Sequence, residues 1–573
     1  MNLKIGYKKK LNSNRKGTKV EKAENKKNKG TSFMKNVFLL MCSEIIVKVL
    51  GLVYRLVITN VEGFGDTGLG YYSAGYQIYA LLLTLCSIGI PSVISKLISE
   101  RLAVGNNYGA QRIFKTALKL FSGIGLFFSV TLFCGADFIA THMLNVPDVA
   151  YVLRVLAPAI FFVATSSVFR GYFSGQQNMK PASVTQVLEQ FLNCVLSIVF
   201  VYALVGKEPY IMAAGGNLST TLSIIVTFLY LAAYYRKNKI DVNENEISKE
   251  EQKKSTKDIV KTILKLSIPI TIGSVISVIS SVIDTATVSN CIQQAFSGIV
   301  TGGKEVLEQL AMEKTGILSK VDNLTNLPIA VNLAFSTALV PAISESIAKK
   351  EYGVASKRLS FSFFASVIII IPCAIGYMCL SNQILGLIYP NAPDGSNVLR
   401  LSSIAMIFVA LSQTINGGLY GLNKPLIPAI SLAVGAAIKL ILNIILVSNP
   451  DINIIGAPIS SIVCQIIAFL ICYKALTKKI KLHIPIGKCI IKPIIAGVIM
   501  GVCVYFSNIA LNLVLSQTIS TVISILIGAI VYVLAVLILR ILSEEDILMI
   551  PYGTKIYSIL KKLKIYKEPK TNA

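Results

Sequence analysis

Apolar runs of about 20 residues recur along the chain from Phe33 to Ile541, with short polar segments between them. A hydrocarbon core is roughly 30 Å thick, and an α-helix needs about 20 apolar residues to cross it. The runs are expected to be helical because a membrane offers no water to pair with the backbone. We count about 14 runs of this length. With 54% hydrophobic and 15% charged residues, the sequence predicts an all-α polytopic membrane protein.

The formal net charge is +26, and its distribution along the chain indicates its role. Alternate connecting segments, such as 61–70, 145–150 and 449–454, lack lysine and arginine. The basic residues gather in the other segments, which are 1–29, 95–119, 235–240, 253–257, 349–358, 478–488 and the C-terminal end. By the positive-inside rule, this pattern over an even number of spans places both termini in the cytoplasm. We expect a multi-pass protein of a bacterial cell membrane, surrounded by membrane lipids and without a nucleic-acid partner.

Two short motifs recur in the second half of the chain. "IPSVISKLISE" (90–100) returns as "VPAISESIAKK" (340–350), and "GYFSGQQNMKP" (171–181) returns as "GGLYGLNKP" (417–425). The prolines are offset by 250 residues in the first pair (341 − 91) and by 244 in the second (425 − 181). Two matches at nearly one offset indicate a direct repeat of six helices.

An even-numbered repeat keeps its orientation, so the halves are expected to be related by a pseudo-two-fold axis along the membrane normal. The predicted segments are a basic cytoplasmic tail (1–32), an N-terminal six-helix lobe (33–235), a cytoplasmic linker (236–260), a C-terminal six-helix lobe (261–477), two extra transmembrane helices (478–541) and a second basic cytoplasmic tail (542–573).

The sequence offers little for catalysis or metal binding. "GIVTGGKE" (298–305) spells the start of a phosphate-binding loop, but Glu305 stands where that loop needs Ser or Thr. The 11 cysteines form no CxxC pair, and the only histidines are His142 and His483. We therefore expect no catalytic residues, no metal site and no cofactor, and a protein that is not an enzyme.

The first apolar run carries three charges on one side. At 100° per residue, Glu44, Lys48, Gly51 and Arg55 fall within a sector of about 60°. A charge at mid-bilayer costs at least about 2.5 kcal/mol, so this stripe is expected to face protein or a water-filled cavity. Two interpretations stay open: Lys48 and Arg55 bind an anionic substrate, or the stripe is a structural ion-pair network.

Further polar residues lie in the apolar runs of both halves. They are Glu189, Asp284, Lys320, Asp322, Asn323, Asn326, Lys439 and Asn443. The segment 319–328 is too hydrophilic for lipid contact and is expected to line a shared cavity with Glu44 and Glu189. Asp284, Lys439 and Asn443 are candidates for coupling transport to Na⁺, H⁺ or the membrane potential, and the alternative is a structural ion pair.

The last two runs contain no charge from Pro493 to Leu539. Two roles fit this composition equally: a lipid-facing support, or a groove that holds a long hydrophobic substrate tail.

Several of these segments carry a resemblance to a known family. They are "KVLGLVYR", "GLGYYSAGYQIYALLLTLCSIGIPSVISKLISE", "VFRGYFSGQQNMKP", "VDNLTNLPIAVNLAFSTALVPAISE" and "GLYGLNKP". From about Phe33 to Ile541 the chain resembles the multidrug/oligosaccharidyl-lipid/polysaccharide (MOP) exporter superfamily. Within it, the chain is similar to the polysaccharide-transport branch, which includes the stage V sporulation protein B group and the MurJ-type lipid II flippases.

The resemblance implies two six-helix lobes in a V, alternating access and a central cationic cavity for an undecaprenyl-pyrophosphate-linked sugar. Lys48 and Arg55 match the basic residues of the family's first helix. Two departures from the lipid II flippases concern the charge of that cavity. Asp322 is followed by Asn323 instead of arginine, and the second run has no basic residue between 71 and 95.

The function predicted from residues and resemblance together is a monomeric flippase for a lipid II-like precursor of peptidoglycan. One alternative is a flippase for another lipid-linked polysaccharide of capsule, teichoic acid or spore cortex. A cation-coupled drug antiporter would use the carboxylates of the cavity instead. A membrane-embedded glycosyltransferase would need a catalytic group on a large outer loop, and the outer loops are short.

Overall fold

A computed structural model describes residues 43, 46–87, 89–240, 255–482 and 484–543. All regular secondary structure within these ranges is helical. Twelve segments of the described residues are long and apolar enough to cross a membrane, with α2 and α3 counted as one. Of the 14 predicted runs, the first begins outside the described residues, and α10 carries charges in its middle. The prediction of an all-α polytopic membrane protein is confirmed.

The first group of helices comprises residues 46–59 and six labelled helices. These are α2 (Gly65–Ser87), α3 (Ile90–Ala103), α4 (Asn107–Phe138), α5 (Val149–Gly175), α6 (Lys180–Ala203) and α7 (Pro209–Asn238). The second predicted run is divided into α2 and α3, and Pro91 lies in the first turn of α3. Proline lacks the N–H that a continuous helix would need there, so a helix start accommodates it.

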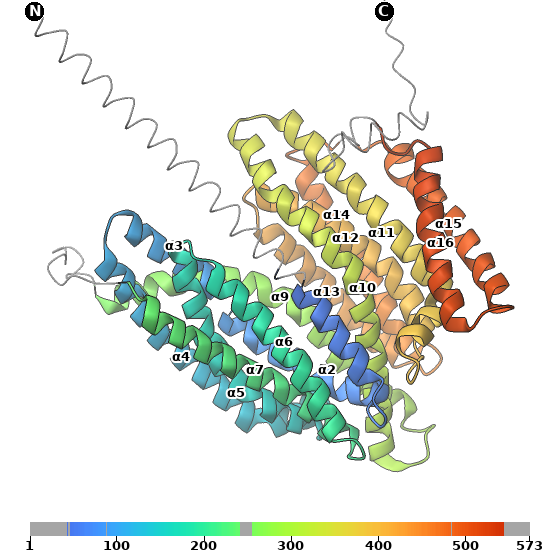
Figure 1. The fold of residues 1–573 in the computed structure, drawn as a ribbon, viewed down its shortest axis with the longest axis horizontal. Coiled ribbons are helices and arrows are strands. Elements are labelled where there is room, and N and C mark those ends of the chain that lie inside the picture. Colours follow the sequence, from blue (N-terminus) through green and yellow to red (C-terminus); the bar gives the residue numbers. More distant parts are fainter. Residues whose placement is uncertain (1–42, 44–45, 88, 241–254, 483, 544–573) are drawn as a thin grey trace, which may run out of the picture.

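The second group follows the connecting segment and is joined to the last two helices. It consists of α9 (Thr256–Phe296), α10 (Gly303–Ala348), α11 (Tyr352–Ile388), α12 (Ser396–Gly421), α13 (Leu426–Val447) and α14 (Gly456–Thr477). The last two helices, α15 (Lys492–Asn512) and α16 (Gln517–Ile538), pack together and against α11, and they carry no charge after Lys492. Figure 1 shows α15 and α16 at the edge of this group, far from α2.

The two groups meet where α2 crosses α10. A methyl group added at Gly70 would lie 1.8 Å from the carbonyl oxygen of Met312, and one added at Gly316 would lie 1.8 Å from that of Asp66. No side chain fits at either position, so the two glycines allow the backbones to touch. This contact fixes the separation of the two groups at the end predicted to face outside.

Polar contacts reinforce the junction at the same end. The Asn60 amide donates to the backbone oxygen of Ile388 at 2.9 Å, and Asn145 donates to the Gln293 side chain at 2.8 Å. Both contacts join segments that belong to different groups and that follow or precede predicted outer loops. The predicted outer side is therefore closed in this structure.

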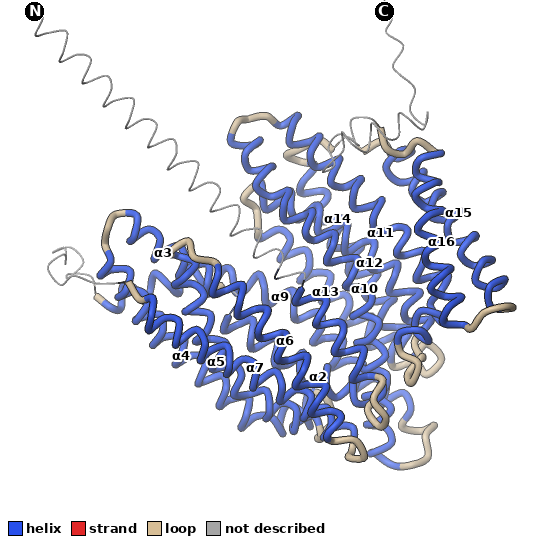
Figure 2. Tube along the Cα trace, viewed as in Figure 1, coloured by secondary structure: helices blue, strands red, loops and turns tan. Residues whose placement is uncertain are grey.

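The groups separate toward the other end, where α3 and the end of α10 lie. Val282 and Met312 belong to a hydrophobic cluster shared with α2 and α5 near the junction. At the predicted cytoplasmic end each group has its own cluster, and the start of α9 contributes Ile259 and Ile263 to the first. Figure 2 shows the same divergence in the helix traces. The described helices of the two groups thus diverge toward the predicted cytoplasmic end.

Candidate functional site

A polar cavity of about 130 Å³ lies between the two groups. It is lined by Arg55, Leu69, Tyr72, Ser73, Tyr76, Gln77, Ser281, Ser319, Asp322, Asn323 and Asn326. These residues come from the first helix, α2, α9 and α10, so the cavity is central. Typical sites for drug-sized ligands measure roughly 300–1,000 Å³. The enclosed space therefore suits a small charged group, and a whole sugar head would need the wider opening beyond it.

Arg55 is the cationic residue of this cavity. Its guanidinium donates to Oδ1 of Asn323 at 2.5 Å and to the Tyr54 hydroxyl at 3.2 Å. It also lies 5.7 Å and 6.0 Å from the ring centres of Tyr54 and Tyr76, within the range of cation–π attraction. Within the described residues it forms no ion pair, and its side-chain hydrogen-bond partners there are neutral.

Asn323 supplies a second donor next to Arg55. Because Arg55 engages Oδ1, the amide group is oriented with Nδ2 away from the guanidinium. Nδ2 is buried and has no hydrogen-bond partner among the described residues. An unpaired buried donor costs free energy, so it favours a ligand that accepts a hydrogen bond. Arg55 and Asn323 together form a donor set for an anion.

The wall opposite Arg55 is polar but not basic. Asp322 and Asn326 are exposed although they lie in the middle of α10, because they face the cavity. The hydroxyl of Tyr54 on the first helix and that of Tyr72 on α2 lie 3.0 Å apart. A carboxylate and amides of this kind accept and donate hydrogen bonds to sugar hydroxyls.

Lys48 does not line the cavity. Its side chain is exposed two turns before Arg55, on the predicted cytoplasmic side. Glu44, the third member of the predicted stripe, lies outside the described residues. The same face of the helix packs against α6, where a methyl group at Gly51 would lie 3.5 Å from Nε2 of Gln190. Of the stripe's members that the structure describes, only Arg55 lines the cavity.

Lys320 was also predicted to line the cavity, and the structure places it elsewhere. Its side chain is 0% exposed and pairs with Asp66 at 2.7 Å. The ammonium also donates to the backbone oxygen of Ala392 at 2.5 Å. Lys320 is three residues from Asn323, but its long side chain turns toward the N-terminal end of α2. It therefore joins the two groups at the closed end.

Asp284, Lys439 and Asn443 come together as predicted for a coupling site or an ion pair. Lys439 of α13 pairs with Asp284 of α9, and Asn443 donates to the same carboxylate at 2.9 Å. Asn443 also contacts the Thr287 hydroxyl at 2.9 Å. Ser281, one turn before Asp284, lines the central cavity. The cluster is thus paired in this state and lies next to the cavity.

Glu189 forms an ion pair with Arg170 of α5 at 2.6 Å, and both side chains are partly buried. The pair does not belong to the cavity around Arg55. Arg170 and Asp66 are partners that the sequence did not predict. Arg170 carried a signal, because it is a charge inside an apolar run and such charges rarely lack a function or a partner.

Two family models match the chain. The model described as "Polysaccharide biosynthesis protein" matches residues 33–347, more than half of the chain. The chain belongs to the polysaccharide biosynthesis protein family. The MatE model matches residues 286–445, within the second group of helices. Together the two matches confirm the resemblance to the MOP superfamily.

Relatives and solved structures agree with this family. "Stage V sporulation protein B" of Bacillus subtilis (strain 168) is 24% identical over 456 residues, covering 79% of this chain and 85% of the relative. "Lipid II flippase MurJ" of the same organism is 24% identical over 440 residues, covering 73% and 78%. A solved structure titled "Lipid II flippase MurJ, inward closed conformation" has a TM-score of 0.67 at 17% identity, covering 87% of this chain and 98% of that one. The fold is that of membrane transporters, and the chain is a transporter family member rather than an enzyme.

Proposed function

We propose that this protein is a flippase for an undecaprenyl-pyrophosphate-linked glycan, with a lipid II-like precursor of peptidoglycan as its substrate. The observation that carries the proposal is Arg55, a guanidinium held by neutral hydrogen-bond partners in a central cavity between two groups of helices. Such a charge is costly in a membrane unless a ligand uses it. The 24% identical relative named as a lipid II flippase supports the same substrate class.

The geometry accounts for how the head group crosses. Pyrophosphate loses hydration worth many kcal/mol if it enters hydrocarbon, so a cavity must replace that water. The substrate enters from the open cytoplasmic side, where Lys48 is exposed. Arg55 then donates bidentate hydrogen bonds to two phosphate oxygens, while Nδ2 of Asn323 donates to a third. Asp322 and Asn326 bind sugar hydroxyls.

Translocation follows from a change in how the two groups of helices meet. We propose that they move as lobes, so that the contacts between α2 and α10 open while the cytoplasmic end closes. The prenyl tail stays in lipid throughout, along the uncharged stretch 493–539 of α15 and α16. The ion pair of Asp284 with Lys439 is adjacent to the cavity and is proposed to respond to Na⁺, H⁺ or the membrane potential during this change.

The test is translocation by the purified full-length protein in proteoliposomes. Fluorescent lipid II is compared with an undecaprenyl-pyrophosphate-linked capsule or teichoic precursor and with a cationic drug. Transport of lipid II faster than the other lipid-linked glycans supports the proposal in full. If only another lipid-linked glycan is transported, the protein is a flippase but lipid II is not its substrate. If only the cationic drug is transported, the proposal is overturned.

A further inference from the structure

The first three turns of α9 carry a row of lysines that the transport site does not use. Lys257, Lys261 and Lys265 are four residues apart, so they lie on one face of the helix over about 12 Å. All three side chains are exposed, and none forms an ion pair among the described residues. The nearby acid, Asp258, caps the helix by accepting from the backbone N–H of Ser255 at 3.3 Å. Among the described residues, no acidic side chain therefore neutralises the row.

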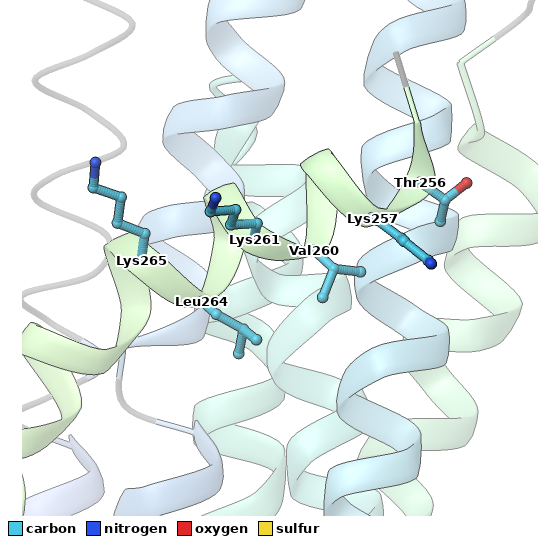
Figure 3. A pocket seen from close by; sticks show the side chains of 6 residues that line it. All are labelled: Thr256, Lys257, Val260, Lys261, Leu264 and Lys265. Atoms are coloured by element: carbon cyan, nitrogen blue, oxygen red, sulfur yellow. The ribbon is translucent and has the colours of Figure 1, made fainter.

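An apolar surface adjoins the lysines. Val260 and Leu264 are partly buried and line a shallow, almost entirely apolar groove of about 570 Å³ together with the lysines. In Figure 3, Lys261 and Lys265 extend to one side of the helix, whereas Val260 and Leu264 point to the other. A helix with a basic side and an apolar side is typical of the membrane interface.

The position along α9 agrees with an interfacial location. The helix has 41 residues and is about 60 Å long, roughly twice the thickness of the hydrocarbon core. Exposed apolar side chains begin one turn after Lys265, at Ile268, Ile270 and Ile272, which are 51%, 44% and 56% exposed. A lysine row one turn before the exposed apolar stretch fits a position just outside the hydrocarbon, at the level of the lipid phosphates.

The opposite face of the same three turns is anchored in the protein. Ile259 and Ile263 are buried in the hydrophobic cluster of α3, α4, α5 and α7. The far end of α9 packs against α13 through Asp284 and Lys439. The segment is thus held rigidly against the first group while it belongs to the helix that continues into the second.

We propose that the first three turns of α9 bind anionic phospholipid of the cytoplasmic leaflet. Lys257, Lys261 and Lys265 contact the lipid phosphates, and Val260 with Leu264 contacts the upper acyl chains. Charge complementarity selects this occupant, because the three side chains of the row are all cationic and exposed. Binding holds the start of α9, which connects the two groups, at the membrane surface. The inference does not depend on which substrate the protein transports.

The absence of tryptophan from the chain allows a direct test. A single tryptophan is introduced as Ile268→Trp, and its fluorescence is quenched in vesicles by brominated phosphatidylglycerol or brominated phosphatidylcholine. Each lysine is expected to favour the anionic lipid about fivefold, and all three on the order of 100-fold, equivalent to roughly 3 kcal/mol. Phe506→Trp, on the lipid-exposed face of α15, reports ordinary lipid and is expected to show little preference.

The preference at position 268 is expected to disappear when Lys257, Lys261 and Lys265 are all replaced by Gln and to persist when all three are replaced by Arg. The control replaces three exposed lysines elsewhere with neutral residues, at Lys478, Lys479 and Lys481. It removes the same amount of charge and is expected to leave the lipid preference at position 268 unchanged. The proposal is overturned if both lipids quench the tryptophan at position 268 equally when the three lysines are intact. It is also overturned if the preference for the anionic lipid survives their replacement by Gln. Displacement of brominated phosphatidylglycerol by a few per cent of undecaprenyl pyrophosphate overturns it as well, because the occupant would then be the transport substrate.

Discussion

The ion pair of Lys320 with Asp66 is expected to hold the outer side of the protein closed. Lys320 is 0% exposed and Asp66 7% exposed, and the two residues belong to different groups of helices. Opening the outer side would separate them and let water reach both charges. Removing one partner leaves the other charge buried and unpaired in the closed state, at a cost of about 3–5 kcal/mol.

This cost sets the expected shift between closed and open states. About 3 kcal/mol corresponds to roughly a 150-fold change in the ratio of the two states. Lys320→Met and Asp66→Asn are each expected to populate the outward-open state by that factor. The double variant has no buried charge, so it is expected to return to within about tenfold of the unmodified protein.

The assay uses a variant without the native cysteines, in which Ser73 is replaced by Cys. Ser73 lines the cavity. The rate at which an impermeant thiol reagent labels this cysteine is measured. Lys314→Met is the matched control on the same helix, because Lys314 pairs with the neighbouring Glu313 in a partly exposed position. It is expected to change labelling little. The pair does not hold the outer side closed if the cysteine is labelled as fast in the double variant as in the single variants. The same conclusion follows if labelling in the single variants is no faster than with the ion pair intact.

Three further predictions concern topology, coupling and packing. Impermeant labelling of intact cells should reach a cysteine at Thr301 but not one at Lys479, and the reverse result would contradict the predicted orientation. Asp284→Asn should change how transport depends on Na⁺, pH or membrane potential without loss of protein from the membrane; an unchanged dependence in proteoliposomes would leave a structural ion pair. Gly70→Ala should destabilise the contact of α2 with α10 by about 1–3 kcal/mol and lower the melting temperature, because its methyl group has no room, whereas Gly123→Ala has open space and should be neutral. Equal melting temperatures would show that the two helices do not touch there.

Local patterns in the sequence were sufficient for the fold class and for part of the site. Apolar run length depends only on the thickness of the membrane, so the helices were predictable one by one. Arg55 was predicted as a cavity residue because it belongs to a stripe of charges inside an apolar run, and such charges need a polar environment whatever the tertiary fold. The hydrophilicity of 319–328 likewise indicated the cavity that Asp322, Asn323 and Asn326 line.

Contacts between distant segments were not predictable in the same way. Lys320 and Asp66 are 254 residues apart, and nothing in either local pattern identifies the other as its partner. The direction in which the long Lys320 side chain extends depends on how α2 packs on α10, which the glycines Gly70 and Gly316 determine. The same holds for Glu189, whose partner Arg170 lies on a neighbouring helix.

The most direct test of the central claim is the rate of lipid II translocation by Arg55 variants in proteoliposomes. Arg55→Ala removes charge-assisted hydrogen bonds worth roughly 3 kcal/mol and is expected to slow transport about 100-fold while the protein stays folded. Arg55→Lys keeps the positive charge but loses the bidentate hydrogen bonding of the guanidinium, so it is expected to retain partial activity. Lys207→Gln, at an exposed position between α6 and α7, serves as the control for loss of a positive charge. Transport by Arg55→Ala within about twofold of the unmodified protein would contradict the account, because the pyrophosphate would then bind elsewhere.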